Sequence, residues 1–448
     1  MFPICANATK PGGAICIIRV SGDDAISITN RIFRSARQKD LTLMTGYTVH
    51  LGEIVEGESI IDNALVIVYH APYSYTGEEA TEIMCHGSSY IVQRIIELLM
   101  AQGCRMARPG EFTERAFMNG KMDLSQAEAV ADLIASSNAA MHRLAMSQMR
   151  GGFSKELKRL RDQLLQMTSL LELEIDFSEE DVEFADRQQL LTLAVDIHNV
   201  IQRLIHSFRI GNAIKNGVPV AIVGAPNVGK STLLNALLHD DRAIVSDIQG
   251  TTRDTIEDTV NIQGITFRFI DTAGIRHSDD QIEQMGIQRS MSAAQRAQII
   301  LMMKEPGTPY PDIPVRDDQT VIHLENKTDL NPQSSTLNSK LSTLNSKLSI
   351  SAKLGTNIDR LEQMLVDAAN IHNVEGSDII VTNVRHVEAL QQALEAIEKV
   401  KQGITQGTTG DLISLDLHAC TDALSEIVGD VTSEDTLQNI FSHFCVGK

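Results

Sequence analysis

The spacing of apolar residues predicts a mixed α/β module at the start of the chain. Residues 14–20 and 64–70 are apolar, β-branched runs of strand length, and residues 90–100 have helical periodicity. Strand and helix patterns are mixed over this stretch, so we expect a mixed α+β module that covers residues 1–117.

Two helical regions follow, with a second α/β segment between them. Apolar residues recur at helical spacing after residue 124 and again after residue 387, and strand-like runs separate the two regions. Helices before and after one α/β segment predict a single helical domain, residues 118–210 and 374–448. An inserted domain, residues 211–373, would interrupt it. The expected fold class is therefore α/β and α.

A glycine-rich stretch at residues 224–232, Gly-Ala-Pro-Asn-Val-Gly-Lys-Ser-Thr, follows a strand-like run and opens a helical one. This spacing and context are those of a phosphate loop. Gly224 and Gly229 let the backbone turn its N–H groups toward phosphate oxygens. Lys230 would reach the β- and γ-phosphates, and the Ser231 hydroxyl would bind Mg²⁺. The stretch predicts a P-loop nucleotide site.

Four further motifs follow in the order and spacing of a guanine-nucleotide site. They are Gly250-Thr-Thr-Arg-Asp254, Asp271-Thr-Ala-Gly274, Asn326-Lys-Thr-Asp329 and Ser351-Ala-Lys353. Thr252 would bind the magnesium, Asp271 would contact its shell, and the Gly274 N–H would contact the γ-phosphate. The Asp329 carboxylate can accept both N–H donors on the guanine edge, which adenine lacks, so the motif favours GTP over ATP.

The residue after the Asp271–Gly274 motif is Ile275, where Ras-type GTPases carry a glutamine that orients the attacking water. An isoleucine cannot orient water, so hydrolysis needs its water-positioning group and its charge neutralisation from elsewhere. Asn227 is a candidate cation ligand and Glu283 a candidate water-positioner. Each also fits an ordinary surface residue.

Composition narrows the class of protein. The chain has 448 residues and a formal net charge of −19, which argues against an all-over electrostatic footprint for nucleic acid or membrane but leaves a local basic groove open. Its six cysteines include no C-x-x-C pair, so neither a disulfide framework nor a zinc site is indicated. Without a signal-peptide pattern or a membrane-length apolar run, we expect a soluble, cytoplasmic protein with no membrane association.

Four segments do not follow core patterning. On pattern alone, residues 76–87 and 108–123 predict loops and helix caps more readily than a site. The acidic run at residues 172–184 predicts a solvated segment, with metal binding as the minor alternative. Two copies of Ser-Thr-Leu-Asn-Ser-Lys-Leu at residues 335–348 predict a duplicated surface insertion.

Three features together carry a family resemblance. They are the nucleotide domain inserted in a helical domain, the segment Arg108-Pro-Gly-Glu-Phe-Thr-Glu-Arg-Ala-Phe-Met-Asn-Gly-Lys-Met-Asp-Leu-Ser-Gln-Ala-Glu-Ala-Val130, and the terminal Phe444-Cys-Val-Gly-Lys448. Over nearly its whole length the chain resembles the MnmE/TrmE family of bacterial and organellar tRNA-modification GTPases. The resemblance implies an N-terminal folate-binding-like domain that pairs two chains into a homodimer, and a Ras-like GTPase (G) domain as the insertion.

The resemblance also implies a folate site in the N-terminal domain. By position, Arg19, Glu82, Lys121 and Lys448 match the family's folate-contacting residues. The ligand would be a tetrahydrofolate derivative, either 5,10-methylene- or 5-formyl-tetrahydrofolate. This moves the interpretation of the two polar segments toward function.

Family G domains dimerise in a potassium-dependent way, and Glu283 matches the family's water-orienting glutamate. The matching potassium ligands are Asn227, Ser246, Ile248 and Thr251. A monovalent cation can take the place of an arginine finger, which would answer the missing glutamine. The predicted GTP-binding residues are Asn227, Val228, Gly229, Lys230, Ser231, Thr232, Ser246, Asp247, Ile248, Gln249, Gly250, Thr251, Thr252, Asp271, Thr272, Ala273, Gly274, Asn326, Lys327, Asp329, Ser351, Ala352 and Lys353.

The family acts with an FAD- and NADH-dependent partner, MnmG (GidA), and the resemblance implies a heterotetramer with it. Together they place an aminomethyl-type group on C5 of the wobble uridine (U34) of certain tRNAs, with folate as the one-carbon source. Cys445 matches the family's terminal cysteine, whose thiolate is a candidate nucleophile or polar contact. GTP hydrolysis would open and close the two G domains as a conformational switch.

Two alternatives stay open. A GTPase of the same superfamily that assists ribosome assembly would need neither folate nor Cys445. A folate-sensing scaffold would use its nucleotide domain only as a switch. Intact Lys230, Thr252 and Asp271 argue against a dead site, and measurable GTP turnover would exclude this last reading.

Overall fold

The computed structural model describes residues 1–176, 186–238, 258–270, 291–330, 346–369, 379–442 and 444–447. The chain divides into two compact units. Unit 1 comprises Met1–Ala131, Gln148–Gln166 and Thr421–Lys448, and unit 2 comprises Asp132–Ser147 and Met167–Cys420. Each unit therefore combines segments that are far apart in the sequence.

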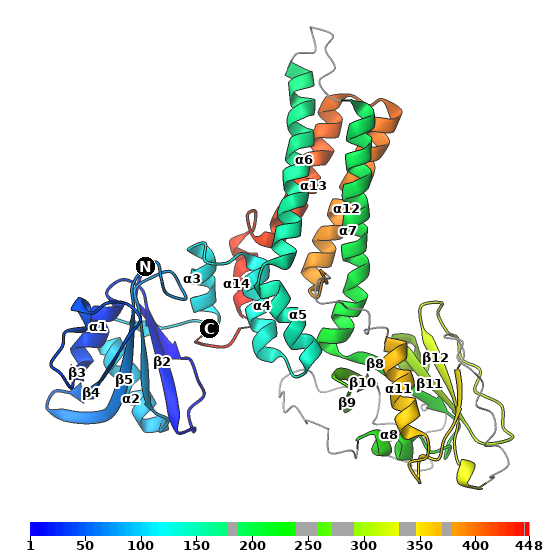
Figure 1. Cartoon of the computed structure of the whole chain (residues 1–448), viewed down its shortest axis with the longest axis horizontal. Helices are drawn as coiled ribbons and strands as arrows, with labels where there is room; N and C mark the ends of the chain where they lie inside the picture. The colour runs from blue at the N-terminus through cyan, green and yellow to red at the C-terminus, as the bar shows by residue number, and fades with distance from the viewer. Residues whose placement is uncertain are drawn as a thin grey trace. The chain divides into compact units, whose positions relative to one another are not determined.

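A seven-stranded sheet forms the N-terminal part of unit 1 (Figure 1). Its strands are β1 (Ile4–Asn7), β2 (Ile15–Ser21), β3 (Phe33–Ser35), β4 (Thr48–Glu56), β5 (Ser59–Tyr69), β6 (Ala80–His86) and β7 (Arg105–Met106). They lie in the order β3-β4-β5-β6-β2-β1-β7, and neighbours are antiparallel except β1 and β7. The strands predicted at residues 14–20 and 64–70 are confirmed as β2 and β5.

One face of this sheet packs against helices α1 (Ala25–Ile32) and α2 (Ser89–Ala101), which confirms the helix predicted at residues 90–100. Val66 and Ile83 of the strands share one hydrophobic core with Ile95 of α2. Because side chains alternate between the faces of a strand, residues between these core positions point to the opposite face of the sheet. That opposite face carries the polar groups described below.

Strand β6 corrects the prediction that residues 76–87 form loops and caps, because residues 80–86 pair with both β5 and β2 inside the sheet. Thr81 and Ile83 are buried, and Glu82 between them is half-buried on the other face. The hydroxyl of buried Thr81 lies 2.6 Å from that of Thr29. Buried polar residues such as Thr81, which bond to distant segments, interrupt the alternation of apolar and polar residues that predicts a strand.

The rest of unit 1 is helical. Its elements include α3 (Glu111–Met118) and α14 (Glu434–Ser442), with the starts of α4 (Leu124–Ala135) and α6 (Gly152–Asp176). Phe441 of α14 packs with Leu124 and Ala127 of α4 in a small core. Residues 108–123, predicted as loops and caps, thus contain the helix α3. The chain enters α6 through Gly151, whose φ of 77° favours glycine.

In unit 2, α7 (Arg187–Asn216) and α12 (Val384–Gln406) pack along each other (Figure 1). Buried Ile197 and Ile201 belong to α7, and buried Leu390 and Ile397 to α12. Helices on either side of the nucleotide segment therefore do pack together. Helix α7 continues to residue 216, so the domain boundary drawn at residue 211 falls inside it. Among the described residues, no helix is long and apolar enough to cross a membrane.

The nucleotide segment of unit 2 forms a second, six-stranded sheet. Its strands are β8 (Val218–Gly224), β9 (Asp258–Ile262), β10 (Ile265–Phe269), β11 (Ile299–Lys304), β12 (Thr320–Glu325) and β13 (Ser346–Ser349). They lie in the order β13-β12-β11-β8-β10-β9, all parallel except the β9–β10 pair. Helices α8 (Lys230–Leu238), α11 (Ile358–Ala369) and α5 (Ala139–Met149) contribute Leu234, Leu365 and Leu144 to its core.

Strand β13 corrects part of the prediction for the repeat at residues 335–348. The last residues of its second copy pair with β12, and Leu348 is buried in the core of the sheet. The first copy lies outside the described residues. Side chains alternate between the two faces of the strand, so Leu348 is buried while its neighbours Lys347 and Ser349 are not. The polar composition of the repeat therefore did not indicate a strand.

Candidate nucleotide site and N-terminal cavity

The predicted phosphate loop lies where β8 ends and α8 begins. Its backbone adopts left-handed conformations at Asn227, with φ 61°, and at Gly229, with φ 99°. A Cβ on Gly229 would clash with the side-chain amide of Asn326, and one on Gly224 would lie 2.7 Å from the Met303 carbonyl oxygen. Close packing therefore requires glycine at both positions, and the positive φ of Gly229 adds a backbone requirement there.

Lys230, the first residue of α8, reaches back over the loop. Its Nζ donates to the carbonyl oxygens of Gly224 at 2.8 Å and Ala225 at 2.9 Å. Burial lowers the pKa of Lys230. Ser231 and Thr232 follow in the first turn and are exposed. A cation held beside inward-facing N–H groups at a helix N-terminus fits a polyphosphate.

Asn326 joins the phosphate loop to the base-recognition loops. Its side chain is 3% exposed; Nδ2 donates to the Val228 carbonyl oxygen at 2.8 Å, and Oδ1 accepts from the Ala352 N–H at 3.0 Å. The Ser351 hydroxyl donates to Asp329 Oδ1 at 2.7 Å and so orients the carboxylate predicted to read guanine. The structure thus brings motifs separated by about a hundred residues into one site.

Lys327 of the same motif forms an ion pair with Glu305, which directly follows β11. Sequence reasoning missed Glu305 as a partner of Lys327. The remaining predicted nucleotide, magnesium, potassium and water-orienting residues lie outside the described residues. They are Ser246, Asp247, Ile248, Gln249, Gly250, Thr251, Thr252, Asp271, Thr272, Ala273, Gly274 and Glu283.

A second candidate site is a cavity of about 110 Å³ on the face of the N-terminal sheet opposite α1 and α2, called the Arg19 cavity below. Arg19 of β2 and Glu82 of β6 are register partners in its wall. The Arg19 Nε and Nη2 atoms donate to Glu82 Oε1 at 2.9 and 2.8 Å, and the Tyr69 hydroxyl donates to Oε2 at 3.1 Å. Burial, followed by the Glu82 charge, raises the pKa of Tyr69 to about 12, so its hydroxyl stays a donor.

The C-terminal segment, residues 444–447, lies beside this cavity. The Gly447 carbonyl oxygen accepts from Arg19 Nη1 at 3.4 Å, and the Cys445 carbonyl oxygen accepts from the Gly110 N–H at 3.4 Å. Cys445 is exposed, whereas the other five cysteines are buried. Lys121 is placed nearby through the loop at residues 71–77, because its Nζ donates to the Pro72 carbonyl oxygen at 2.9 Å. Lys448 lies outside the described residues.

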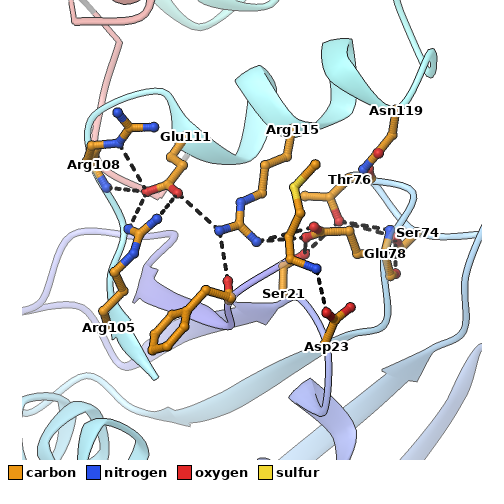
Figure 2. Close-up of polar contacts among 12 residues, drawn as sticks. Ser21, Asp23, Ser74, Thr76, Glu78, Arg105, Arg108, Glu111, Arg115 and Asn119 are labelled. Atoms are coloured by element: carbon orange, nitrogen blue, oxygen red, sulfur yellow. Dashed lines mark hydrogen bonds and ion pairs between the residues drawn. The ribbon is translucent and has the colours of Figure 1, made fainter. Parts of the chain in front are cut away.

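Sequence reasoning also missed a buried ion-pair network on α3, shown in Figure 2. Arg115 contacts Glu78 at 3.1 Å and Glu111 at 3.1 Å, and Glu111 pairs in addition with Arg105. Burial raises the pKa of Glu111, but the bonds from Arg105, the Arg108 N–H and Arg115 outweigh it and lower that pKa to about 2. The opposite charges of Arg105, Glu111 and Arg115, six or fewer residues apart, were the available signal for the part of the network within residues 105–115.

The low pKa of Glu111 predicts a pH-dependent contribution to stability. A carboxyl whose pKa falls from 4.5 in the unfolded chain to about 2 in the folded chain stabilises above pH 4.5. That contribution, about 3 kcal/mol, is lost as the pH falls from 4.5 toward 2. We expect Glu111→Gln to have a lower free energy of unfolding than the unsubstituted chain at pH 7. At pH 3 most of this difference between the two proteins should be gone. Urea unfolding at both pH values measures it.

Glu58→Gln, which changes an exposed carboxylate of the same module, serves as the control and should leave both unfolding curves unchanged. A constant difference between Glu111→Gln and the unsubstituted chain at both pH values would contradict the assignment of the charge-assisted bonds to Glu111.

Two family models and full-length relatives match nearly the whole chain. The family model described as the GTP-binding protein TrmE N-terminus matches residues 3–121, and the MnmE helical domain model matches residues 124–445. A tRNA modification GTPase MnmE from Bacteroides thetaiotaomicron is 56% identical, with 99% of each chain covered. Its counterpart from Parabacteroides distasonis is 54% identical, with 100% of each covered. A solved structure of the G domain of the FeoB iron transporter from T. maritima is 19% identical over 34% of this chain and 98% of that chain, with a TM-score of 0.22.

Proposed function

The chain belongs to the MnmE family of tRNA modification GTPases, and we propose that it hydrolyses GTP as part of a complex that modifies the wobble uridine of tRNA at C5. The observation that carries the proposal is the site itself. In a chain similar over its whole length to such enzymes, Asn326 ties the phosphate loop to the loop beside Asp329. A ribosome-assembly GTPase is disfavoured, because the full-length relatives carry the tRNA modification name.

In the G domain, residues 211–373, the described groups fit a guanine nucleotide. Lys230 would bind the β- and γ-phosphates and Ser231 the magnesium, while Asp329 would accept the guanine N–H donors. Thr252 would complete the magnesium site. Asn227, with Ser246, Ile248 and Thr251, would hold a potassium ion that offsets charge on the transferred phosphoryl group. Glu283 would orient the attacking water, and hydrolysis would switch the paired G domains between open and closed forms.

In the N-terminal domain, residues 1–117, the Arg19 cavity would hold a tetrahydrofolate derivative that supplies the one-carbon unit. Arg19 and Glu82 offer a donor and an acceptor side by side, as a heterocycle with both kinds of group requires. The cavity volume of about 110 Å³ is below the roughly 300–1,000 Å³ typical of small-molecule sites, so a folate would be held by one end only. Lys121 and Lys448 would bind elsewhere on the ligand, and Cys445 would act at its one-carbon end.

The proposed assembly is a homodimer through the N-terminal domain, and a heterotetramer with MnmG that receives tRNA in the cytoplasm. An apolar patch on the sheet face that carries Arg19 supports pairing with a second copy. Val49 and Leu51 of β4 are 56% and 60% exposed there, and Leu65 of β5 is the register partner of Leu51. Exposed apolar area of this kind is characteristic of a protein interface.

Potassium dependence tests the proposed mechanism. We expect GTP turnover by the purified chain to rise at least about tenfold in potassium buffer relative to sodium buffer, because the cation replaces an arginine finger. Asn227→Gly should abolish the rise: glycine accepts the φ of 61° at this position but lacks the amide oxygen. Asn357→Gly, at an exposed position that also has φ 61°, is the matched control. Equal turnover in the two salts would contradict cation-assisted hydrolysis.

A further inference from the structure

Three charged side chains of the N-terminal module are almost completely buried. Arg115, Glu78 and Glu111 are 6%, 9% and 2% exposed, and they are called the Arg115 bridge below. Arg115 Nη1 lies 3.2 and 3.1 Å from the two Glu78 oxygens. Its Nη2 donates to Glu111 Oε1 at 3.1 Å and to the Phe2 carbonyl oxygen at 2.9 Å. One guanidinium therefore ties two carboxylates from different segments (Figure 2).

The Glu78 arm of the bridge reaches the Arg19 cavity. The Ser21 hydroxyl donates to Glu78 Oε2 at 2.7 Å and lies 2.6 Å from the Thr76 hydroxyl. Ser21 and Thr76 both line the cavity. Thr76 is held from the other side, since Asn119 Nδ2 donates to its carbonyl oxygen at 2.8 Å. The position of Glu78 thus sets part of the cavity wall.

The Glu111 arm reaches the C-terminal segment, residues 444–447, which is called the Cys445 segment below. Glu111 Oε2 accepts from the Arg108 N–H at 2.8 Å, which closes the turn at residues 108–111. Within this turn Pro109 forms a β-bridge with Val446, and the Gly110 N–H donates to the Cys445 carbonyl oxygen. Gly110 has φ 68°, and a Cβ there would lie 2.6 Å from the Phe441 carbonyl oxygen. The turn and the segment are therefore in close contact.

Stability alone does not require such a bridge, because well-packed apolar residues commonly replace buried ion pairs without loss of stability. What a guanidinium adds is geometry: its planar fork can serve two carboxylates and a carbonyl at fixed directions, which an ammonium cannot. We propose that Arg115 is a positioning residue that fixes the Cys445 segment relative to the wall of the Arg19 cavity. The proposal rests on the proposed function of that cavity and of Cys445.

The test uses Cys445 as a natural labelling site, because the other five cysteines are buried. A nitroxide attached to Cys445 of the full chain should give an immobilised electron paramagnetic resonance spectrum. Arg115→Lys, which keeps the charge but loses the fork, should add a mobile component below the unfolding temperature. Glu111→Gln, which cuts only the arm to the turn, should do the same and serves as a second variant should Arg115→Lys fail to fold.

Two controls bracket this result. Gly110→Ala should release the label directly, because the methyl group would push against Phe441. Arg94→Gln, which removes ion pairs to Glu56 and Glu97 elsewhere in the module, should leave the label immobilised. If Arg115→Lys and Glu111→Gln lower only the unfolding temperature while the spectrum stays immobilised, Arg115 has a structural role alone and the proposal is overturned.

Binding provides the second readout. Arg115→Lys should weaken 5-formyl-tetrahydrofolate binding at least about tenfold while GTP turnover in the same preparation stays within about twofold. An unchanged affinity with a released label would also overturn the proposal, since the segment would then not matter to the cavity. If the unsubstituted chain binds no folate, the proposed cavity function fails, but the spectra still decide whether Arg115 positions the segment.

Discussion

Replacing Lys230 with methionine is expected to reduce GTP turnover by about 10²–10³-fold, the loss typical when one donor aimed at developing charge is removed. Methionine keeps most of the apolar stem, so the packing of α8 should survive. It cannot replace the ammonium, which lies over the loop within 2.8–2.9 Å of the Gly224 and Ala225 carbonyl oxygens. Phosphate release from GTP and the affinity for a fluorescent GDP analogue measure the two parts of the loss.

Lys399→Met is the matched control, because it makes the same chemical change on the exposed surface of α12. It should leave turnover and nucleotide affinity unchanged. Turnover by Lys230→Met within a few-fold of the unsubstituted chain would contradict the assignment of this loop as the catalytic phosphate site.

Replacing Asn326 with alanine is expected to lower the free energy of unfolding of the nucleotide domain by about 2–6 kcal/mol. The change leaves the Val228 carbonyl and the Ala352 N–H without the partners that they have now, and each unsatisfied buried group costs about 1–3 kcal/mol. Because the same side chain holds the phosphate loop against the base loops, GTP affinity should fall together with stability. Urea unfolding and nucleotide titration of one preparation measure both effects.

Asn216→Ala is the control for this substitution. Asn216 is exposed at the end of α7, where its amide donates to Asn212 in the same helix, so a change within about 0.5 kcal/mol is expected. Loss of GTP affinity without loss of stability in Asn326→Ala would mean that the amide touches the nucleotide and does not brace the loops.

Much of the fold could be predicted from local pattern. The periodicity of apolar residues located β2, β5, β8, α2 and the long helices, because burial of one face repeats every two residues in a strand and about every 3.6 in a helix. The predictions failed at β6 and β13. There, polar residues such as Thr81 find hydrogen-bond partners from distant segments, and a one-dimensional pattern carries no information about such partners.

The nucleotide site was accessible in the same way, since each motif is a short run whose residue types dictate a chemistry. The Arg19 cavity was reached only through family resemblance, and the Arg115 bridge was not predicted at all. Its carboxylates lie 33 positions apart in the chain, at Glu78 and Glu111, and the segment that it supports is more than 300 residues further on.

The amino-acid order alone therefore established the phosphate loop, the guanine-reading motif, the helical regions and the family. Only folding decided that Asn326 braces the phosphate loop, that Glu305 pairs with Lys327, and that the carbonyl oxygen of Gly447 lies beside Arg19. The physical reason is the range of the interactions. Strand and helix patterns depend on neighbours within a few residues, whereas these contacts depend on which surfaces pack together once the apolar faces are buried.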